Sequence, residues 1–264
     1  MKILWINPIG GNLFDRPIGG MLRRAARPGT EVDVISLPPG RPLHLEYHSY
    51  EGLVTGDIVN IVWSLSERYD AIVIGCFYDV GLREAREVSR RAVVTAPCQS
   101  TLLFVSQLAN SFSILVGRRK WIPKMRENVH GYGYGDRLAS MRAVELGVHD
   151  FQADPKRTAS LLIEEGRRAV EEDLAEAVIL GCTIEYGFSE KMQDALGVPV
   201  IDAVVAPFKI AELMAEAAGL FRLYPSRKWG SEPPPQAEVS SMGLFKNGLG
   251  GYPILRDRDI ARNP

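Results

Sequence analysis

Residues 70–82 read DAIVIGCFYDVGL, and residues 176–188 read EAVILGCTIEYGF. Both stretches contain an acidic residue, an alanine, three aliphatic residues and Gly-Cys, then a second acid three places after the cysteine and a glycine two places later. A single strand entering a tight turn can read this way by chance, but two copies with matched acids and glycines are harder to explain. The repeat predicts a duplicated α/β unit with Cys76 and Cys182 at equivalent positions.

The rest of the chain alternates short β-branched runs with longer amphipathic stretches, which is typical of a parallel sheet covered by helices on both faces. VVTAP at 93–97 resembles VIDAV at 200–204, and KILWINP at 2–8 resembles SILVGRR at 113–119. Apolar spacing predicts helices over 51–68 and 155–174, and Asp154 before Pro155 is an N-cap signal. The predicted strands are Lys2–Ile6, Glu31–Ser36, Ala71–Gly75, Ala92–Thr95, Ser113–Val116, Met141–Leu146, Ala177–Gly181 and Val198–Ile201.

We therefore expect an α/β fold of two similar Rossmann-like or flavodoxin-like parallel-sheet domains, related by pseudo-twofold symmetry. The first would span 1–97 and 204–223, and the second 98–203. Residues 224–264 are rich in Pro, Ser and Gly, which predicts a loosely structured C-terminal tail. Ligands in such folds bind beyond the carboxyl ends of the strands, so each Gly-Cys falls at a ligand-binding position. If the halves face each other, the two thiols oppose one another across an inter-domain cleft.

Composition narrows the partners to small molecules. The 264 residues are 46% hydrophobic and 24% charged, with a net charge of −1 and no basic block, which argues against nucleic acid or an anionic membrane as the main partner. No apolar run approaches the roughly 18 residues of a membrane span. The starting segment MKILWINP is too short for a signal-peptide core, so we expect a cytoplasmic location.

The three cysteines do not form a disulfide framework or a metal site by their spacing. The repeat separates the pair Cys76 and Cys182 from Cys98, which we interpret as a packing or pocket-wall residue. Two opposed thiols suit the inversion of a carbon acid, because one can remove a proton while the other returns one to the opposite face. A thiol pKa of about 8.5, lowered at a helix N-terminus, suits this exchange, and no cofactor is required.

The two Gly-Cys segments, together with INP at 6–8, RLAS at 137–140 and GVPVIDA at 197–203, resemble the aspartate/glutamate/hydantoin racemase superfamily. The hydantoin racemase branch is the nearest, over roughly residues 2–220. The resemblance implies two α/β domains with the active site between them, and cofactor-independent racemisation of a hydantoin-like or amino-acid-like substrate. It also implies that Cys76 and Cys182 are the bases and that the protein forms dimers or larger assemblies.

The chain departs from the hydantoin racemase branch at two points. It has Ile9-Gly10-Gly11 after Asn7-Pro8, where that branch usually continues with Asn and a hydroxyl residue. It also has Cys182-Thr183-Ile184-Glu185 where that branch commonly has Gly-Cys-Ala-Gly, and Thr183 matches the amino-acid racemases instead. Both changes alter the pocket wall. Cys76 argues against the arylmalonate decarboxylase branch, which keeps only the second thiol.

The remaining candidates are polar groups near the predicted strand ends. Asp79 and Glu185 either tune the thiols or bind substrate nitrogens, or else cap helices. Asn7 is a candidate hydrogen-bond donor, and Arg118 a candidate partner for a carboxylate. Backbone N–H groups after each cysteine are expected to hold the oxygen on which charge develops. The predicted substrate contacts are Asn7, Phe77, Tyr78, Asp79, Arg118, Thr183, Ile184 and Glu185.

Two further segments have weaker signals. His44 and His48 in HLEYH have helical metal-ligand spacing, but the preceding PPGRP predicts a loop and no third ligand is visible, so we expect no metal. GYGYGD, with Tyr132 and Tyr134, is either a flexible loop that closes over the cleft or a plain surface turn. The competing functional class is a non-catalytic two-lobed small-molecule binder, or a thiol-redox protein in which Cys76 and Cys182 bond to each other.

Overall fold

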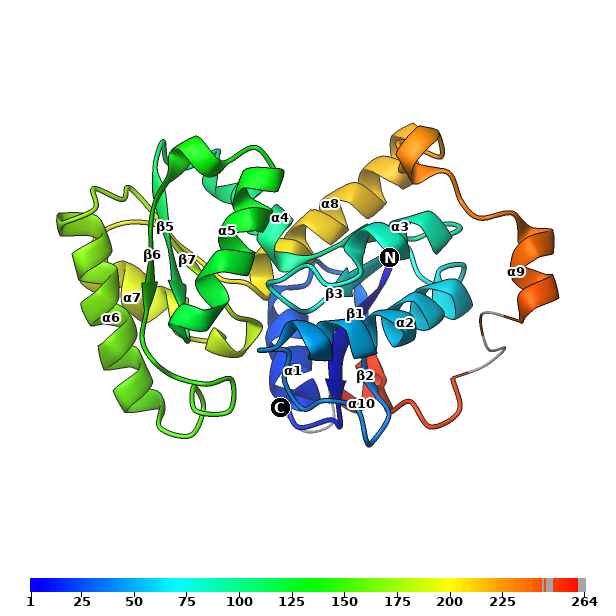
Figure 1. The fold of residues 1–264 in the computed structure, drawn as a ribbon, viewed down its shortest axis with the longest axis horizontal. Helices are drawn as coiled ribbons and strands as arrows, with labels where there is room; N and C mark the ends of the chain where they lie inside the picture. The colour runs from blue at the N-terminus through cyan, green and yellow to red at the C-terminus, as the bar shows by residue number, and fades with distance from the viewer. Residues whose placement is uncertain (244, 246–248, 261–264) are drawn as a thin grey trace. The chain divides into compact units, whose positions relative to one another are not determined.

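The chain folds as two α/β units, each built on its own sheet (Figure 1). The computed structural model describes residues 1–243, 245 and 249–260. Unit 1 comprises Met1–Gly75, Val80–Ala96 and Phe208–Pro264, and unit 2 comprises Cys76–Asp79 and Pro97–Pro207. These bounds differ from the predicted domains: residues 76–79, 97 and 204–207 group with unit 2, and the C-terminal tail groups with unit 1.

Unit 1 contains a five-stranded sheet in the order β4-β3-β1-β2-β9. The first four strands in sequence are parallel, and β9 pairs antiparallel with β2. Their buried residues form near-continuous apolar runs, as expected for strands covered on both faces. The strands are β1 (Lys2–Gly10), β2 (Glu31–Leu37), β3 (Ala71–Ile74), β4 (Val93–Thr95) and β9 (Ile254–Leu255), and the helices are α1 (Asp15–Ala25), α2 (His48–Leu65), α3 (Leu82–Val88) and most of α8 (Val205–Phe221).

Unit 2 contains a four-stranded sheet in the order β6-β5-β7-β8, with all strands parallel. Asp154 accepts a hydrogen bond from the Arg157 amide, so the predicted N-cap is confirmed. The strands are β5 (Phe112–Val116), β6 (Leu138–Ala143), β7 (Val178–Leu180) and β8 (Val200–Ile201), the α-helices are α4 (Pro97–Val105), α5 (Ile122–Gly131), α6 (Pro155–Glu171) and α7 (Ser189–Leu196), and the 3-10 helices are η1 (Arg119–Trp121), η2 (Gly135–Arg137) and η3 (Thr183–Glu185).

The strand order in the two sheets is consistent with the predicted duplication. Without β9, unit 1 reads β2-β1-β3-β4 and unit 2 reads β6-β5-β7-β8, so each strand has a counterpart four strands later. The two Gly-Cys segments contain β3 and β7, and the two weaker sequence repeats contain β1 with β5 and β4 with β8. The prediction of two similar parallel-sheet domains is confirmed, and β9 is an antiparallel addition that it lacked. No helix among the described residues is both long and apolar enough to cross a bilayer.

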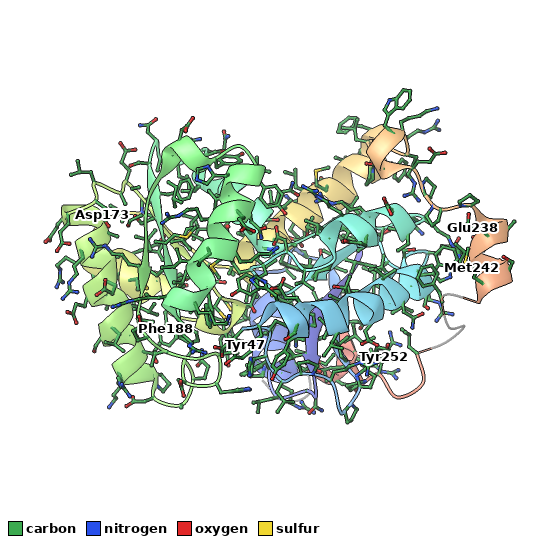
Figure 2. The ribbon with its side chains drawn as sticks, in the orientation of Figure 1. Tyr47, Asp173, Phe188, Glu238, Met242 and Tyr252 are labelled. Carbon is green, nitrogen blue, oxygen red and sulfur yellow. The ribbon has the colours of Figure 1, made fainter. Side chains whose placement is uncertain are left out.

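The C-terminal tail is more ordered than we expected for residues 224–264. It contains η4 (Trp229–Ser231), α9 (Gln236–Met242), β9 and α10 (Asp257–Ile260). The Tyr252 hydroxyl donates to Asp57 Oδ1 at 2.6 Å, and Figure 2 labels this tyrosine. Ile260 is 5% exposed and packs on Gly19 of α1, where a Cβ would lie 2.8 Å from its Cδ1. Residues 244, 246–248 and 261–264 of the predicted tail lie outside the described residues.

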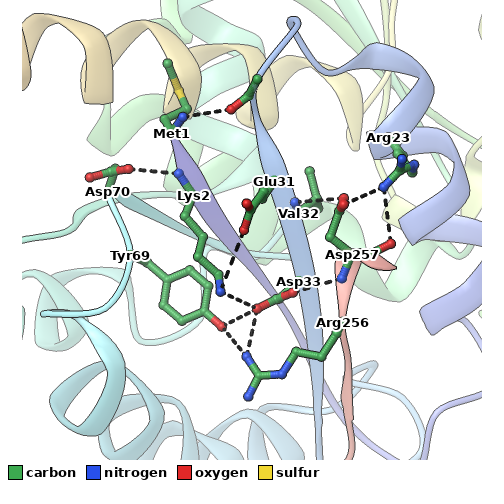
Figure 3. A network of polar contacts seen from close by, with 11 residues as sticks. Met1, Lys2, Arg23, Glu31, Val32, Asp33, Tyr69, Asp70, Arg256 and Asp257 are labelled. Atoms are coloured by element: carbon green, nitrogen blue, oxygen red, sulfur yellow. Dashed lines mark hydrogen bonds and ion pairs between the residues drawn. The ribbon is translucent and has the colours of Figure 1, made fainter. Parts of the chain in front are cut away.

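Asp33 on β2 anchors this tail (Figure 3). Its side chain is only 2% exposed, and Oδ2 accepts from Arg256 at 2.8 Å and from the Tyr69 hydroxyl at 2.7 Å. Oδ1 accepts from the Asp257 amide at 2.9 Å, and Lys2 Nζ lies 3.3 Å from Oδ2. Burial raises the pKa of Asp33, but these donors outweigh it and hold the pKa below its usual value. One buried carboxylate therefore joins the tail to the sheet.

Replacing Arg256 with methionine should lower the free energy of unfolding at pH 7 by about 1–2 kcal/mol, because a buried acceptor loses a charged donor. An acid whose pKa is lowered on folding contributes stability above its unfolded pKa of about 3.9, and this contribution is lost as the pH falls through the folded pKa. The gap between wild type and Arg256→Met should therefore shrink below about pH 4, as measured by urea titration. Arg258→Met, at an 80% exposed side chain, is the control, and equal effects of both changes would contradict the assignment.

Candidate active site

Cys182 follows β7 after Gly181, a position with no room for a side chain. A Cβ on Gly181 would lie 2.5 Å from the Leu115 carbonyl oxygen on the neighbouring strand. Cys182 then starts η3, and its Sγ accepts a hydrogen bond from the Ile184 amide at 3.5 Å. An N–H group directed at sulfur favours the thiolate over the thiol. The local backbone therefore supports a base at this position.

Glu185 supports this turn through a hydrogen bond to the backbone of Cys182. Its side chain is 1% exposed, and Oε2 accepts from the Cys182 amide at 3.2 Å. Burial raises the pKa of Glu185 well above its usual range and the charge of Asp202 raises it further, whereas the Cys182 and Gly181 amides act in the opposite direction. Glu185 Oε1 and Asp202 Oδ2 are both buried without a hydrogen-bond partner. This environment favours an uncharged Glu185, which places no negative charge beside the Cys182 thiol.

Cys76 follows β3 after Gly75, which is also tightly confined, because a Cβ there would lie 2.5 Å from the Trp5 ring. The Cys76 carbonyl accepts from the Asp79 amide at 2.9 Å, closing a tight turn. Asp79 has a φ of 53°, a left-handed conformation that is uncommon outside glycine. Its carboxylate accepts from the Cys98 amide at 2.8 Å and the Gln99 amide at 2.9 Å. Asp79 therefore caps the first turn of α4.

Asp79 and Glu185 thus both accept hydrogen bonds from backbone amides. Capping of this kind is the alternative to substrate contact in the sequence analysis. The two acids accept these bonds differently, because Glu185 bonds back to its own cysteine and Asp79 reaches a helix that starts at Pro97. Phe77, Tyr78, Thr183 and Ile184 are 3%, 8%, 6% and 5% exposed, so the side chains that follow each cysteine are largely buried. The backbone amides of Phe77, Tyr78 and Thr183 remain the candidate donors to substrate, since the Ile184 amide donates to Cys182 Sγ.

The topology of unit 2 brings several candidates to one edge of its sheet. Arg118 and Cys182 follow the adjacent parallel strands β5 and β7, at the point where the strand order reverses and ligands of such folds bind. The Cys76 turn lies next to the start of α4 in the same unit, because the Asp79 carboxylate accepts from the Cys98 and Gln99 amides.

Asn7 lies in unit 1, in a buried polar network. Its Oδ1 accepts from Trp5 Nε1 at 2.7 Å, and its Nδ2 donates to Asp15 Oδ1 at 2.6 Å. The Ser36 hydroxyl donates to the same Asp15 oxygen at 2.5 Å. Burial raises the pKa of Asp15, against the effect of the Ser36 and Asn7 hydrogen bonds. Asn7 is 4% exposed, so the network orients its amide at the carboxyl half of β1.

The remaining cysteine and histidines lie in different surroundings. Cys98 is fully buried, and burial followed by the charge of Asp79 raises its pKa well above the usual value. His44 lies 3.8 Å from Glu46, and His48 lies 3.1 Å from Glu51. Among the residues that the structure describes, no three His, Cys, Asp or Glu side chains are grouped as metal ligands.

Sequence reasoning missed the residues that brace the two cysteine turns. Gln152 Nε2 donates to the Ile184 carbonyl at 2.8 Å and to the Tyr186 carbonyl at 3.2 Å, which supports η3. Asn128 Nδ2 donates to the Tyr78 carbonyl at 2.8 Å, which supports the Cys76 turn. Single amide side chains have no motif, so nothing in the sequence marks these two.

The fold and the paired Gly-Cys turns define a class, the duplicated α/β protein with a cysteine at the carboxyl end of a matched strand in each half. Residues 3–211 match the family model for Asp/Glu/hydantoin racemases, so the chain belongs to this family and is an isomerase of the racemase type.

Similar proteins agree with this membership. The chain is 37% identical over 217 residues to a hydantoin racemase of Pseudomonas sp. (strain NS671), covering 82% of this chain and 86% of that one. It is 33% identical over 219 residues to a hydantoin racemase of Paenarthrobacter aurescens, covering 80% and 90%. The solved structure of an allantoin racemase from Klebsiella pneumoniae matches with a TM-score of 0.80 at 26% identity, covering 89% of this chain and 94% of that one.

Alkylation should separate the three thiols. We expect iodoacetamide at pH 8 to label the half-buried Cys76 and Cys182 in the native protein and to leave Cys98 unlabelled, because Cys98 is inaccessible and its thiolate is disfavoured. Peptide mass spectrometry measures each site, and guanidinium should expose all three equally. Labelling of native Cys98 at the rate of the other two would contradict its buried placement.

Glu185→Gln should become more stable relative to wild type as the pH rises from about 4.5 to 8. An acid whose pKa is raised on folding binds more protons in the native state, so it costs stability above its unfolded pKa of about 4.3, and glutamine has no such cost. Urea titrations across this pH range measure the difference, and Glu190→Gln, which removes an exposed carboxyl from α7, is the control. A pH-independent difference would show that Glu185 titrates normally.

Proposed function

We propose that this protein racemises a cyclic carbon acid of the hydantoin type by moving a proton between Cys76 and Cys182. The supporting observation is that both cysteines follow matched strands and that both belong to unit 2. The relatives named hydantoin racemase, at 37% and 33% identity, support the substrate class. The ring carbon of a hydantoin is bonded to an uncharged carbonyl, which accepts the electron pair more readily than the carboxylate of a free amino acid, so its proton is more acidic.

The reaction needs one thiolate and one thiol. The thiolate takes the proton from the ring carbon, and the electron pair left behind moves onto the adjacent carbonyl oxygen as an enolate. The second thiol then gives its proton to the opposite face of the carbon, so the substrate is inverted and the two sulfurs have exchanged protonation states. The roles reverse for the other enantiomer, and no electron or group is consumed.

We assign the other roles in the reaction to the surrounding residues. The Ile184 amide is assigned to the Cys182 thiolate, and the backbone amides of Phe77, Tyr78 and Thr183 are assigned to the enolate oxygen. Arg118, at the end of β5, is assigned to a polar group of the substrate. Glu185 and Asp79 are assigned to the backbone of the cysteine turns, since their carboxylates accept backbone amides there.

An acyclic amino acid is the second candidate substrate. Thr183 after Cys182 matches amino-acid racemases, and Arg118 could pair with a free carboxylate. A hydantoin has no carboxylate at its ring carbon. Arg118→Gln should therefore raise KM strongly for an amino-acid substrate and only weakly for a hydantoin.

Deuterium exchange tests the mechanism. In deuterated buffer, wild type should replace the ring-carbon proton of both enantiomers of a 5-substituted hydantoin, as seen by NMR, and should racemise each, as seen by circular dichroism. Cys76→Ala and Cys182→Ala should each lower racemisation by about 100-fold or more, because each removes one acid/base group. Each variant should still exchange the proton of the one enantiomer that faces the remaining thiol.

Cys98→Ala is the matched control and should racemise like wild type. A buffer-only sample corrects for spontaneous exchange, and the same measurements with free amino acids compare the two substrate classes. Undiminished racemisation by either Cys76→Ala or Cys182→Ala would rule out the two-thiol mechanism.

A further inference from the structure

The turn that carries Cys76 is held by unit 2, although it follows a strand of unit 1. Residues Cys76–Asp79 come one residue after β3 ends, and they group with unit 2 because their contacts are with that unit. Two of the side chains that hold the turn are Asn128 on α5 and Tyr132, the residue that follows α5. Neither belongs to the repeated cysteine segments. Hydrogen bonds across the sequence therefore decide where this cysteine lies.

The first anchor is the Asp79 carboxylate. Oδ1 accepts from the Cys98 amide at 2.8 Å, and Oδ2 accepts from the Gln99 amide and the Tyr132 hydroxyl, both at 2.9 Å. Asp79 is 7% exposed and adopts a left-handed backbone, which is unfavourable for a residue with a side chain. The three charge-assisted hydrogen bonds offset this cost, since such bonds are stronger than neutral ones. The Asp79 backbone in turn closes the Cys76 turn.

The second anchor is Asn128 on α5, the helix that ends just before Tyr132. Asn128 Nδ2 donates to the Tyr78 carbonyl at 2.8 Å, and Tyr132 follows Asn128 by one helical turn, with its amide donating to the Asn128 carbonyl at 2.9 Å. Asn128 and Tyr132 therefore contact consecutive residues of the Cys76 turn. Together they fix both the backbone and the side chain at the end of that turn.

The segment GYGYGD that contains Tyr132 is a closed turn. Gly133 has a φ of 83°, which favours glycine, and a Cβ on Gly135 would lie 2.1 Å from the His130 ring. The Tyr134 amide donates to the Val129 carbonyl at 3.0 Å. These constraints hold Tyr132 against Asp79 rather than leaving it on a free loop.

We propose that Tyr132 is a positioning residue for Cys76, acting through its hydrogen bond to Asp79. The proposal rests on the two-thiol racemase function and deepens it. Tyr132 does not touch the reacting atoms. Through its hydroxyl it holds the turn whose first residue is Cys76, because Asp79 is the last residue of that turn. Its loss should therefore impair one of the two bases and spare the other.

Tyr132→Phe is the test, because it removes one hydroxyl and keeps the ring. Tyr134→Phe is the matched control: Tyr134 is also half-buried, it lies two residues away, and its hydroxyl makes no hydrogen bond with any residue that the structure describes. For each variant, two quantities are measured in the same preparation. One is the ratio of the alkylation rates of Cys76 and Cys182, and the other is the rate of deuterium exchange for each hydantoin enantiomer.

Tyr132→Phe should change the Cys76 to Cys182 alkylation ratio by about threefold or more through Cys76 alone. It should slow exchange by about tenfold for the enantiomer that Cys76 deprotonates, mainly in kcat, and leave the other within about twofold. Tyr134→Phe should leave both quantities within about twofold of wild type. A general loss of fold would move both thiols and both enantiomers together, so equal changes, like no change, would overturn the proposal.

The two hypotheses fail separately. If wild type exchanges no hydantoin or amino-acid proton, the proposed function fails, and the alkylation ratio still decides whether Tyr132 positions Cys76. If wild type exchanges both enantiomers but Tyr132→Phe leaves the ratio and the enantiomer rates unchanged, the racemase function stands and the positioning role is wrong.

Discussion

Each cysteine turn depends on a glycine that has no room for a side chain. Gly75 lies against the Trp5 ring and Gly181 against the Leu115 carbonyl, and in both cases a Cβ would approach to 2.5 Å. Such a contact is far inside van der Waals distance, so any side chain would displace a core residue or a strand. The close approach lets the chain leave the sheet sharply, and the next residue is then at the carboxyl edge. Packing therefore requires the glycine of each Gly-Cys pair, whatever chemistry the cysteine performs.

The two copies have diverged around this shared constraint. Cys182 has a backbone N–H on its sulfur and a buried carboxyl that favours the neutral form, whereas Cys76 belongs to a turn whose acid is hydrogen-bonded by α4 and Tyr132. The matched acids Asp79 and Glu185 thus hold equivalent positions in sequence and different positions in the hydrogen-bond network. The two acid/base groups of a racemase act on opposite faces of the substrate carbon, so they do not need identical surroundings. The surroundings of Cys76 and Cys182 differ.

Much of this arrangement could be predicted from the sequence, because it depends on local patterns. The apolar runs predict eight parallel strands, and the repeat predicts that β3 and β7 hold equivalent positions in their sheets. Partners distant in the sequence could not be predicted. Asp79 was expected to act near its own cysteine, yet it caps a helix that begins at Pro97, and nothing local to Tyr132 marks it as a ligand of that carboxylate. The tail was missed for the same reason, since its anchor, Asp33, lies more than 200 positions from Arg256 in the chain.

These distant bonds change where the first cysteine belongs. Its strand is part of the unit 1 sheet, so a reading by sequence assigns Cys76 to the first half and Cys182 to the second. The hydrogen bonds of Tyr78 and Asp79 instead assign the Cys76 turn to unit 2, which also contains Cys182. Under the proposed two-thiol mechanism, the two sulfurs would be held by the α4, α5 and η3 segments of one unit. Proton transfer is sensitive to displacements of about 1 Å, so the proposed mechanism depends on how firmly these segments hold the two cysteine turns.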